Sequence, residues 1–152
     1  MIQIITKITV KWKSPSRIYN WILHLNKERY HKWHPAHISC ERPANLKVGD
    51  TIWFEEVLNG FKVNYKWRIM ELKTDNSILM KANFFYPIYL SLSFSPLNKD
   101  TEVIHELKIG FVYHGLEKIF DWLVRKLAVP PKKIEAIERH ATEEFKNLEN
   151  IL

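Results

Sequence analysis

Residues 50–73 read DTIWFEEVLNGFKVNYKWRIMELK, in which two runs of alternating apolar and polar side chains flank Asn59-Gly60. Such alternation is typical of strands that bury one face. Asn-Gly is the strongest short signal for the turn of a β-hairpin. The stretch therefore predicts two antiparallel strands, Asp50–Leu58 and Lys62–Lys73.

The same two-residue period continues on both sides of this hairpin. Short polar segments, such as Thr74-Asp75-Asn76 and Leu97-Asn98-Lys99-Asp100, separate the runs and favour tight turns. A meander of consecutive antiparallel strands is the simplest topology. The further strands that we predict are Ile2–Trp12, Ile38–Arg42, Ser77–Phe85, Ile88–Pro96 and Glu102–Phe111.

Helical spacing of apolar residues replaces this period in two regions. After the first strand, Ser14-Pro15 provides a helix cap for a short helix at Ser16–Leu25, and a second helix covers Lys27–Trp33 before Pro35. After the last strand, an amphipathic helix is predicted to end before Pro130-Pro131. Its apolar residues are Leu116, Ile119, Phe120, Leu123 and Leu127.

A final helix is predicted from about Lys132 to the C-terminus, because this stretch contains neither Pro nor Gly. The resulting order of elements is α+β, with about seven strands and a long last helix that can cover the concave face of a curved sheet. A curved sheet and a straight helix commonly leave a cavity between them. The apolar stripe of the helix comprises Ile134, Ile137, Ala141, Phe145, Leu148 and Leu152.

Composition bounds the class of protein. A length of 152 residues with 46% hydrophobic residues suits one core, so we expect a single domain over residues 1–152. With 4 Gly, no glycine-rich phosphate loop can be drawn. The single cysteine, Cys40, excludes an internal disulfide and a thiolate metal cluster, which fits a reducing cytoplasm.

Charge and hydropathy suggest no membrane or nucleic-acid function. The net charge of +6 is spread among acidic residues without a dense basic block, so we expect no nucleic-acid partner. No signal-peptide pattern or membrane-spanning run is present, and we expect a cytoplasmic protein without integral membrane association. The oligomeric state, monomer or homodimer, stays open.

His140 and Glu144 stand four residues apart in the predicted last helix, so both side chains can reach one ion. Helical phasing places both on the flank of the apolar stripe, whereas Glu143 points toward water. The plainer alternative is a solvated His/Glu contact on the helix surface.

His31, His34 and His37 cluster in one short segment, although the whole chain has 7 His. Imidazole is a common metal ligand, but one of these histidines can equally be a structural donor to the backbone. His105 and His114 are isolated among apolar residues, and we interpret them as core or pocket-lining side chains.

Glu55 and Glu56 lie mid-strand, where neighbouring side chains point to opposite faces. Because Glu56 shares a face with apolar Phe54 and Leu58, we favour Glu56 as the inward-facing ligand or base. The alternative is a cross-strand salt bridge to Lys66 or Arg68.

Three stretches, together with the order of elements, resemble the SRPBCC superfamily of START-like, helix-grip domains. More narrowly, they resemble its branch related to diacetylphloroglucinol hydrolase. The stretches are Lys32-Trp33-His34-Pro35-Ala36-His37, Val48-Gly49-Asp50-Thr51-Ile52-Trp53-Phe54-Glu55-Glu56 and Glu138-Arg139-His140-Ala141-Thr142-Glu143-Glu144.

The resemblance implies a zinc site of two His and two Glu, one pair spaced His-x-x-x-Glu. On this chain it points to His140, Glu144, Glu56 and either His34 or His37, with Glu56 and His34 as catalytic candidates. Nitrogen and oxygen donors suit zinc and also suit manganese or iron.

The implied function is a metal-dependent hydrolase or lyase acting on an acylated aromatic or polyketide-like molecule. Two alternatives are a non-catalytic carrier of a hydrophobic or aromatic small molecule, which needs only the cavity, and a metal-independent polyketide cyclase or dehydratase. The aromatic residues that we expect to line the ligand pocket are Trp53, Phe54, Tyr65, Trp67, Phe84, Tyr86, Phe94 and Phe111.

Overall fold

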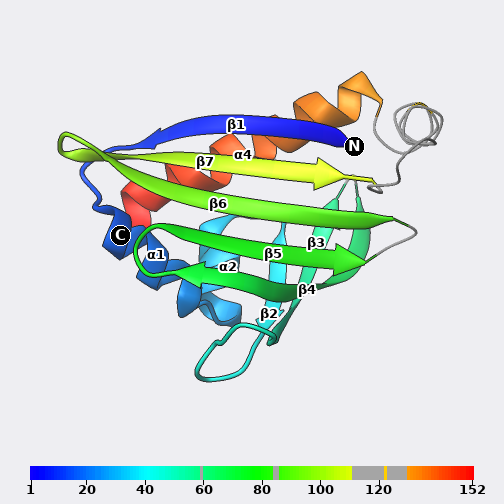
Figure 1. Ribbon diagram of the computed structural model, residues 1–152, viewed down its shortest axis with the longest axis horizontal. Coiled ribbons are helices and arrows are strands. Elements are labelled where there is room, and N and C mark those ends of the chain that lie inside the picture. The colour runs from blue at the N-terminus through cyan, green and yellow to red at the C-terminus, as the bar shows by residue number, and fades with distance from the viewer. Residues whose placement is uncertain (59, 84–85, 111–121, 123–129) are drawn as a thin grey trace.

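The computed structural model describes residues 1–58, 60–83, 86–110, 122 and 130–152 (Figure 1). Within these residues, seven strands form one antiparallel sheet in the order β1-β7-β6-β5-β4-β3-β2. The strands are β1 (Ile2–Val10), β2 (His37–Glu41), β3 (Thr51–Leu58), β4 (Phe61–Lys73), β5 (Ser77–Asn83), β6 (Pro87–Leu97) and β7 (Asp100–Ile109).

The sheet is a meander, because each strand from β2 to β7 pairs with the next and β1 pairs with β7. This topology confirms the predicted one, and the strand ends lie within two residues of those expected from the alternation. In the β3–β4 hairpin, Gly60 has φ +82°. Glycine adopts this left-handed conformation without the steric cost that a side chain would add.

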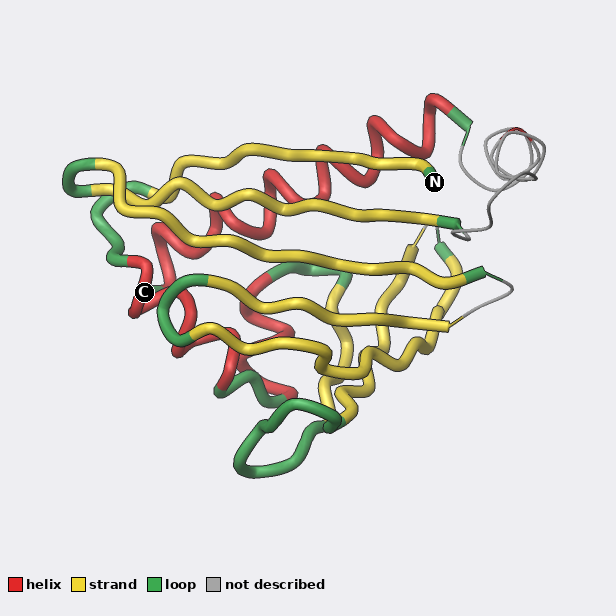
Figure 2. The backbone as a smooth tube through the Cα atoms, in the orientation of Figure 1, coloured by secondary structure: helices red, strands yellow, loops and turns green. Residues whose placement is uncertain are grey.

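The sheet bends strongly along β4. This strand is 13 residues long, and its pairing with β5 shifts register between Ile69 and Glu71. An irregularity of this kind bends a strand and increases its twist. In Figure 2, β2 and β3 therefore run at a steep angle to β6, β7 and β1.

Within the described ranges, three helices lie on one side of this sheet: α1 (Pro15–Leu23), α2 (Lys27–Trp33) and α4 (Pro131–Ile151). Ser14 caps α1 by accepting a hydrogen bond from the Arg17 backbone N–H, and Asn26 caps α2 through the Arg29 backbone N–H. The predicted bounds of α2 are confirmed, and α1 and α4 differ from prediction by one or two residues at their ends. None of the helices within the described residues is both long and apolar enough to cross a membrane.

The main core fills the space between the sheet and the helices. Alternate residues of β1 are buried, and Ala141, Phe145 and Leu148 of α4 are buried as the predicted apolar stripe requires. Complete burial of a side chain such as Phe145 contributes about 2–3 kcal/mol. Cys40 is buried in this core as a free thiol, and burial raises its pKa to about 12, so it stays protonated.

Some predictions fall outside the described residues. The predicted helix with Leu116 and Leu127 lies there, as do the candidate pocket residues Phe84 and Phe111 and the isolated His114.

Candidate functional site

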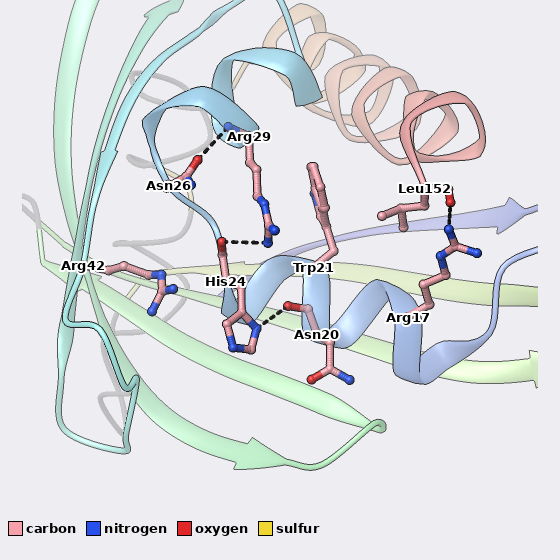
Figure 3. Close-up of a pocket in the computed structure, with 8 residues that line it drawn as sticks. All are labelled: Arg17, Asn20, Trp21, His24, Asn26, Arg29, Arg42 and Leu152. Carbon is pink, nitrogen blue, oxygen red and sulfur yellow. Dashed lines mark hydrogen bonds between the residues drawn. The ribbon is translucent and has the colours of Figure 1, made fainter.

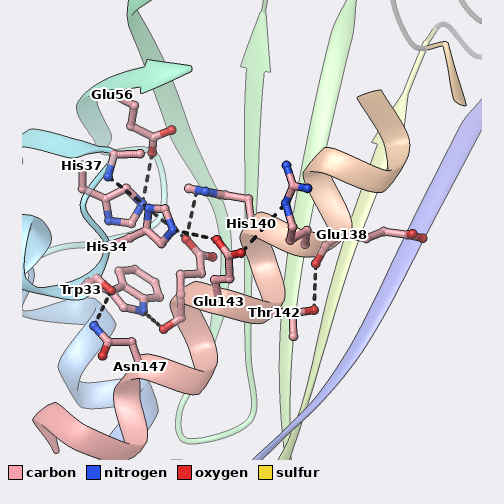
Figure 4. Close-up of polar contacts among 12 residues, drawn as sticks. Trp33, His34, His37, Glu56, Glu138, His140, Thr142, Glu143 and Asn147 are labelled. Atoms are coloured by element: carbon pink, nitrogen blue, oxygen red, sulfur yellow. Dashed lines mark hydrogen bonds and ion pairs between the residues drawn. The ribbon is translucent and has the colours of Figure 1, made fainter. Parts of the chain in front are cut away.

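The candidate ligands come together from three separate parts of the chain (Figure 4). His34 and His37 lie where α2 gives way to β2, and the β2–β3 pairing puts His37 directly opposite Glu56. His140 and Glu144 project from α4 toward this corner of the sheet.

Three hydrogen bonds join α4 to the end of α2, one of them from the Asn147 side-chain amide to the main-chain oxygen of Lys32 at 3.1 Å. The Trp33 indole N–H donates to the main-chain oxygen of Glu144 at 2.7 Å. The Asn147 side-chain amide donates to the main-chain oxygen of Trp33 at 2.9 Å. These contacts set the helix so that His140 and Glu144 face the two N-terminal histidines.

His37 is the centre of the cluster, with only 1% of its surface exposed. Its Nδ1 lies 3.1 Å from the main-chain oxygen of Tyr30. Because a carbonyl oxygen can only accept, Nδ1 carries the hydrogen and Nε2 of the neutral ring carries a lone pair. The Tyr30 ring stacks on this imidazole at a centroid distance of 4.0 Å and holds its plane.

The lone pair on His37 Nε2 faces two carboxylates. Nε2 lies 3.6 Å from Oε1 of Glu56 and 3.4 Å from Oε2 of Glu144, and it is buried without a hydrogen-bond partner among the described residues. A buried acceptor between two acidic groups is unfavourable unless a cation or a proton lies among them.

Burial shifts the titration of both partners in this contact. It lowers the pKa of His37 to about 4, so this ring is neutral at neutral pH. Burial, with the Glu56 charge nearby, raises the pKa of Glu144 to about 8, against the opposing effect of His140. The site therefore favours the uncharged forms of His37 and Glu144 until a cation supplies positive charge.

Glu56 faces inward, as predicted, and is 6% exposed. Its carboxylate accepts hydrogen bonds from the hydroxyls of Tyr30 and Tyr65. Burial raises the pKa of both tyrosines, so both hydroxyls remain protonated donors. The alternative salt bridge from Glu56 to Lys66 or Arg68 is not formed, and the outward-facing Glu55 instead pairs with Lys62 at 3.0 Å.

Phasing of the last helix is confirmed for its two acids. Glu144 is 9% exposed, whereas the side chain of Glu143 is 55% exposed. His140 Nε2 lies 3.6 Å from Oε2 of Glu144, and burial lowers the pKa of His140. The pair is therefore partly buried and is not the solvated surface contact of the plainer interpretation.

His34 has the opposite proton arrangement to His37. Its Nδ1 accepts the Ala36 backbone N–H at 3.1 Å, so its Nε2 carries the hydrogen. Nε2 lies 3.3 Å from Oε2 of Glu143, to which it donates. One nitrogen from each of His34, His37 and His140 lies within 4.8 Å of the others.

His31 is a structural donor, since its Nδ1 lies 2.8 Å from the main-chain oxygen of His37. His105 is buried on β7 opposite Thr6 of β1, with its Nδ1 unpaired. The burial of His105 matches the core interpretation given to it.

The predicted pocket aromatics divide between the two faces of the sheet. Phe54, Trp67 and Phe94 are buried, and Tyr65 reaches Glu56. Trp53 is 50% exposed, and the Lys66 ammonium lies over its ring. Adjacent residues of a strand point to opposite faces, so Trp53 faces outward where Phe54 faces inward. Trp53 therefore cannot line the same surface as Phe54. Tyr86 is half-buried against a smaller core around Ile2, Ile4 and Ile109.

Sequence reasoning missed Tyr30, Trp33 and Asn147, which hold the site together. Tyr30 and Trp33 have the spacing of one helix face, and that signal indicates only burial. Nothing local in the sequence shows that Glu56 of β3 accepts from Tyr30, or that α4, more than a hundred residues away, supplies the partner of Trp33.

No protein-family model matches the sequence. No curated protein matches it either. Solved structures, in contrast, match along nearly the whole chain. The crystal structure of Ara h 8.0201 has a TM-score of 0.71 at 12% identity, covering 99% of this chain and 96% of that one.

Two bacterial structures are similar to the same extent. TTHA0849 from Thermus thermophilus has a TM-score of 0.70 at 18% identity, covering 98% of this chain and 95% of that one. A START superfamily protein from Mycobacterium smegmatis has a TM-score of 0.67 at 15% identity, with coverages of 98% and 95%. The chain therefore has the START-like, helix-grip fold.

Proposed function

We propose that this protein binds a divalent metal, zinc in the first place, through His37, Glu56, His140 and Glu144. The observation that carries the proposal is the buried, unpaired Nε2 of His37, which faces the carboxylates of Glu56 and Glu144. A cation among these groups would satisfy the lone pair and offset the repulsion between the acids. Two imidazoles and two carboxylates form a donor set that zinc accepts, as do manganese and iron.

The two N-terminal histidines take different roles in this proposal. His37 offers a lone pair that its bond to Tyr30 directs toward the acids, which suits a ligand. His34 offers a hydrogen on Nε2 and contacts the exposed Glu143, which suits a residue that passes protons between the site and solvent.

We further propose that the metal site serves a hydrolase or lyase acting on an acylated aromatic or polyketide-like molecule. The support is the resemblance of three sequence stretches to the diacetylphloroglucinol hydrolase branch. A bound zinc would polarise the acyl carbonyl and activate water. Tyr30 and Tyr65 would hold Glu56 in place as ligand or base, and His34 would supply the proton to the departing ring carbon.

Non-catalytic binding of a hydrophobic or aromatic molecule is the second candidate. The fold favours it, because helix-grip domains set a long helix against the concave face of a sheet. Buried aromatic residues on that face, Phe54 and Trp67 among them, would contact such a ligand.

Zinc titration of protein purified without an affinity tag and stripped by chelation tests the metal site. Glu144→Gln removes one ligand charge while keeping its shape, and we expect zinc affinity to fall more than about tenfold. Glu143→Gln is the matched control, since the neighbouring exposed acid should leave affinity nearly unchanged. If the parent protein takes up none of zinc, manganese and iron, the metal site does not exist.

Incubation with 2,4-diacetylphloroglucinol separates the two candidate functions. A hydrolase releases acetate only with metal present, and loses this activity in Glu144→Gln. A carrier binds the compound without converting it, and binds it equally well in both proteins.

A further inference from the structure

A second concave site lies beside α1 and α2 (Figure 3). Its lining includes none of the candidate metal ligands His34, His37, Glu56, His140 and Glu144. Its volume is about 590 Å³. The walls come from α1, the start of α2, the residue that follows β2 and the C-terminal end of α4. The lining residues are Arg17, Asn20, Trp21, His24, Asn26, Arg29, Arg42 and Leu152.

The charged side chains that line this pocket are all positive. The lining includes three guanidinium groups and no acidic side chain. Arg17 already donates to the main-chain oxygen of Leu152. Arg29 and Arg42 also donate to main-chain oxygens, but each keeps one terminal nitrogen, Nη2, outside these bonds.

Both of these arginines are held in place by the backbone. Arg42 donates from Nε to the Leu25 oxygen at 2.6 Å, and from Nη1 to the oxygens of Pro43 and Ala44 at 2.7 and 3.0 Å. Within the described residues its Nη2 makes no hydrogen bond. Arg29 donates from Nη1 to the His24 oxygen at 3.2 Å, which likewise leaves Nη2 available. Groups fixed before binding lose little conformational entropy when a ligand arrives.

Trp21 gives an independent sign of a missing acceptor. Its indole Nε1 is buried and, in the part of the chain that the structure describes, has no hydrogen-bond partner. The Arg29 guanidinium lies over the face of the indole ring, 5.1 Å from its centroid, and both residues line the pocket. Buried donors are normally satisfied, and an anionic oxygen is the acceptor that a pocket of arginines selects.

We propose that this pocket binds the phosphate group of a small organic phosphate, through Arg29, Arg42 and the indole N–H of Trp21. Phosphate offers several oxygens to forked guanidinium donors and carries more charge than a carboxylate. The pocket exceeds the size of phosphate alone, and the Trp21 ring offers an apolar surface to the organic part. The same headgroup chemistry occurs in soluble phosphomonoesters and in phosphatidic acid. The site is independent of the proposed metal centre, with which it shares no residue.

Calorimetric titration of the full chain with phenyl phosphate tests the soluble form of this ligand. Vesicles of phosphatidylcholine, with and without phosphatidic acid, test the lipid form by co-sedimentation. We expect saturable binding in at least one arm, and Arg29→Gln should weaken it about tenfold or more. The matched control is Lys27→Gln, which removes an exposed charge outside the lining and should change affinity less than about twofold.

Trp21→Phe supplies a second variant that keeps an aromatic ring and deletes the unpaired donor. It should weaken phosphate binding several-fold, because one donor to the phosphate is lost. Absence of binding in both arms would overturn the proposal. Equal weakening by Arg29→Gln and Lys27→Gln would overturn it too, because it would reduce the effect to general attraction by positive charge.

Discussion

At the scale of single residues, backbone contacts determine what His34 and His37 can do. They are three positions apart and close in space, yet one accepts a backbone N–H and the other donates to a backbone oxygen. Each contact fixes the tautomer of its ring, so the remaining nitrogen, Nε2, is a donor in His34 and carries a lone pair in His37. The sequence left the choice between these histidines open, because the irregular turn at Pro35 carries no period from which a direction can be read.

The buried His105 should make stability depend on pH. Burial lowers its pKa to about 4, with the nearby His140 acting in the same direction, whereas the unfolded chain keeps an ordinary value of about 6.5. The unfolded state therefore binds the proton first, and stability falls as pH drops from about 6.5 toward 4. Between pH 7 and pH 4.5, the free energy of unfolding of the parent protein should fall. We expect it to fall by about 2 kcal/mol less in His105→Leu.

Urea unfolding at the two pH values, in metal-free buffer, measures this difference. His37 is also buried and neutral, so part of the pH dependence should remain in the variant. Identical losses in the variant and the parent would show that His105 is protonated at little cost in the folded protein.

At the scale of elements, the two halves of the site differ in how far the sequence predicts them. Helical phasing was enough to predict that Glu144 is buried and Glu143 exposed, because α4 is regular throughout. The alternation of apolar and polar residues in β3 was likewise enough to predict that Glu56 faces inward. The β2–β3 pairing has a register shift between His37 and Ser39, and no periodic signal predicts which histidine such a bulge aims at Glu56.

The attachment of α4 to α2 should be needed for tight metal binding. Asn147 donates to the main-chain oxygens of Lys32 and Trp33 at 3.1 and 2.9 Å. Asn147→Ala should lower the free energy of unfolding by about 1–2 kcal/mol. It should also lower zinc affinity several-fold, since His140 and Glu144 belong to the same helix. Chemical denaturation and zinc titration measure the two effects.

Asn150→Ala is the control for that helix, because the one hydrogen bond of the Asn150 amide to a described residue goes to the Asn147 side chain, at 3.4 Å. It should leave stability within about 0.5 kcal/mol of the parent value. If the Asn147 and Asn150 variants bind zinc equally, the attachment does not position the ligands.

At the scale of the whole molecule, the candidate ligands connect the α2–β2 corner, β3 and the C-terminal helix. A metal that binds only the folded chain stabilises it by mass action, by about 2.7 kcal/mol at a free concentration one hundred times Kd. For a protein of 152 residues this corresponds to a rise in Tm of roughly 5–10 °C.

Thermal unfolding with and without zinc measures this rise. Glu144→Gln should shift little under the same conditions, whereas Glu143→Gln should shift like the parent. A rise of equal size in Glu144→Gln would indicate that zinc stabilises the fold from somewhere else.

The pairing of β1 with β7 has a consequence for how the chain is made. Ile2 lies opposite Ile109, so the strand of this sheet that is synthesised first pairs with the strand that is synthesised last. The hairpins from β2 to β7 can close in order as they emerge, but β1 cannot take its place until β7 follows. Loop closure over such a separation is slow compared with hairpin formation. During synthesis the apolar side of β1 therefore remains without its final partner, and a nascent chain halted before residue 100 has no strand on which to seat it.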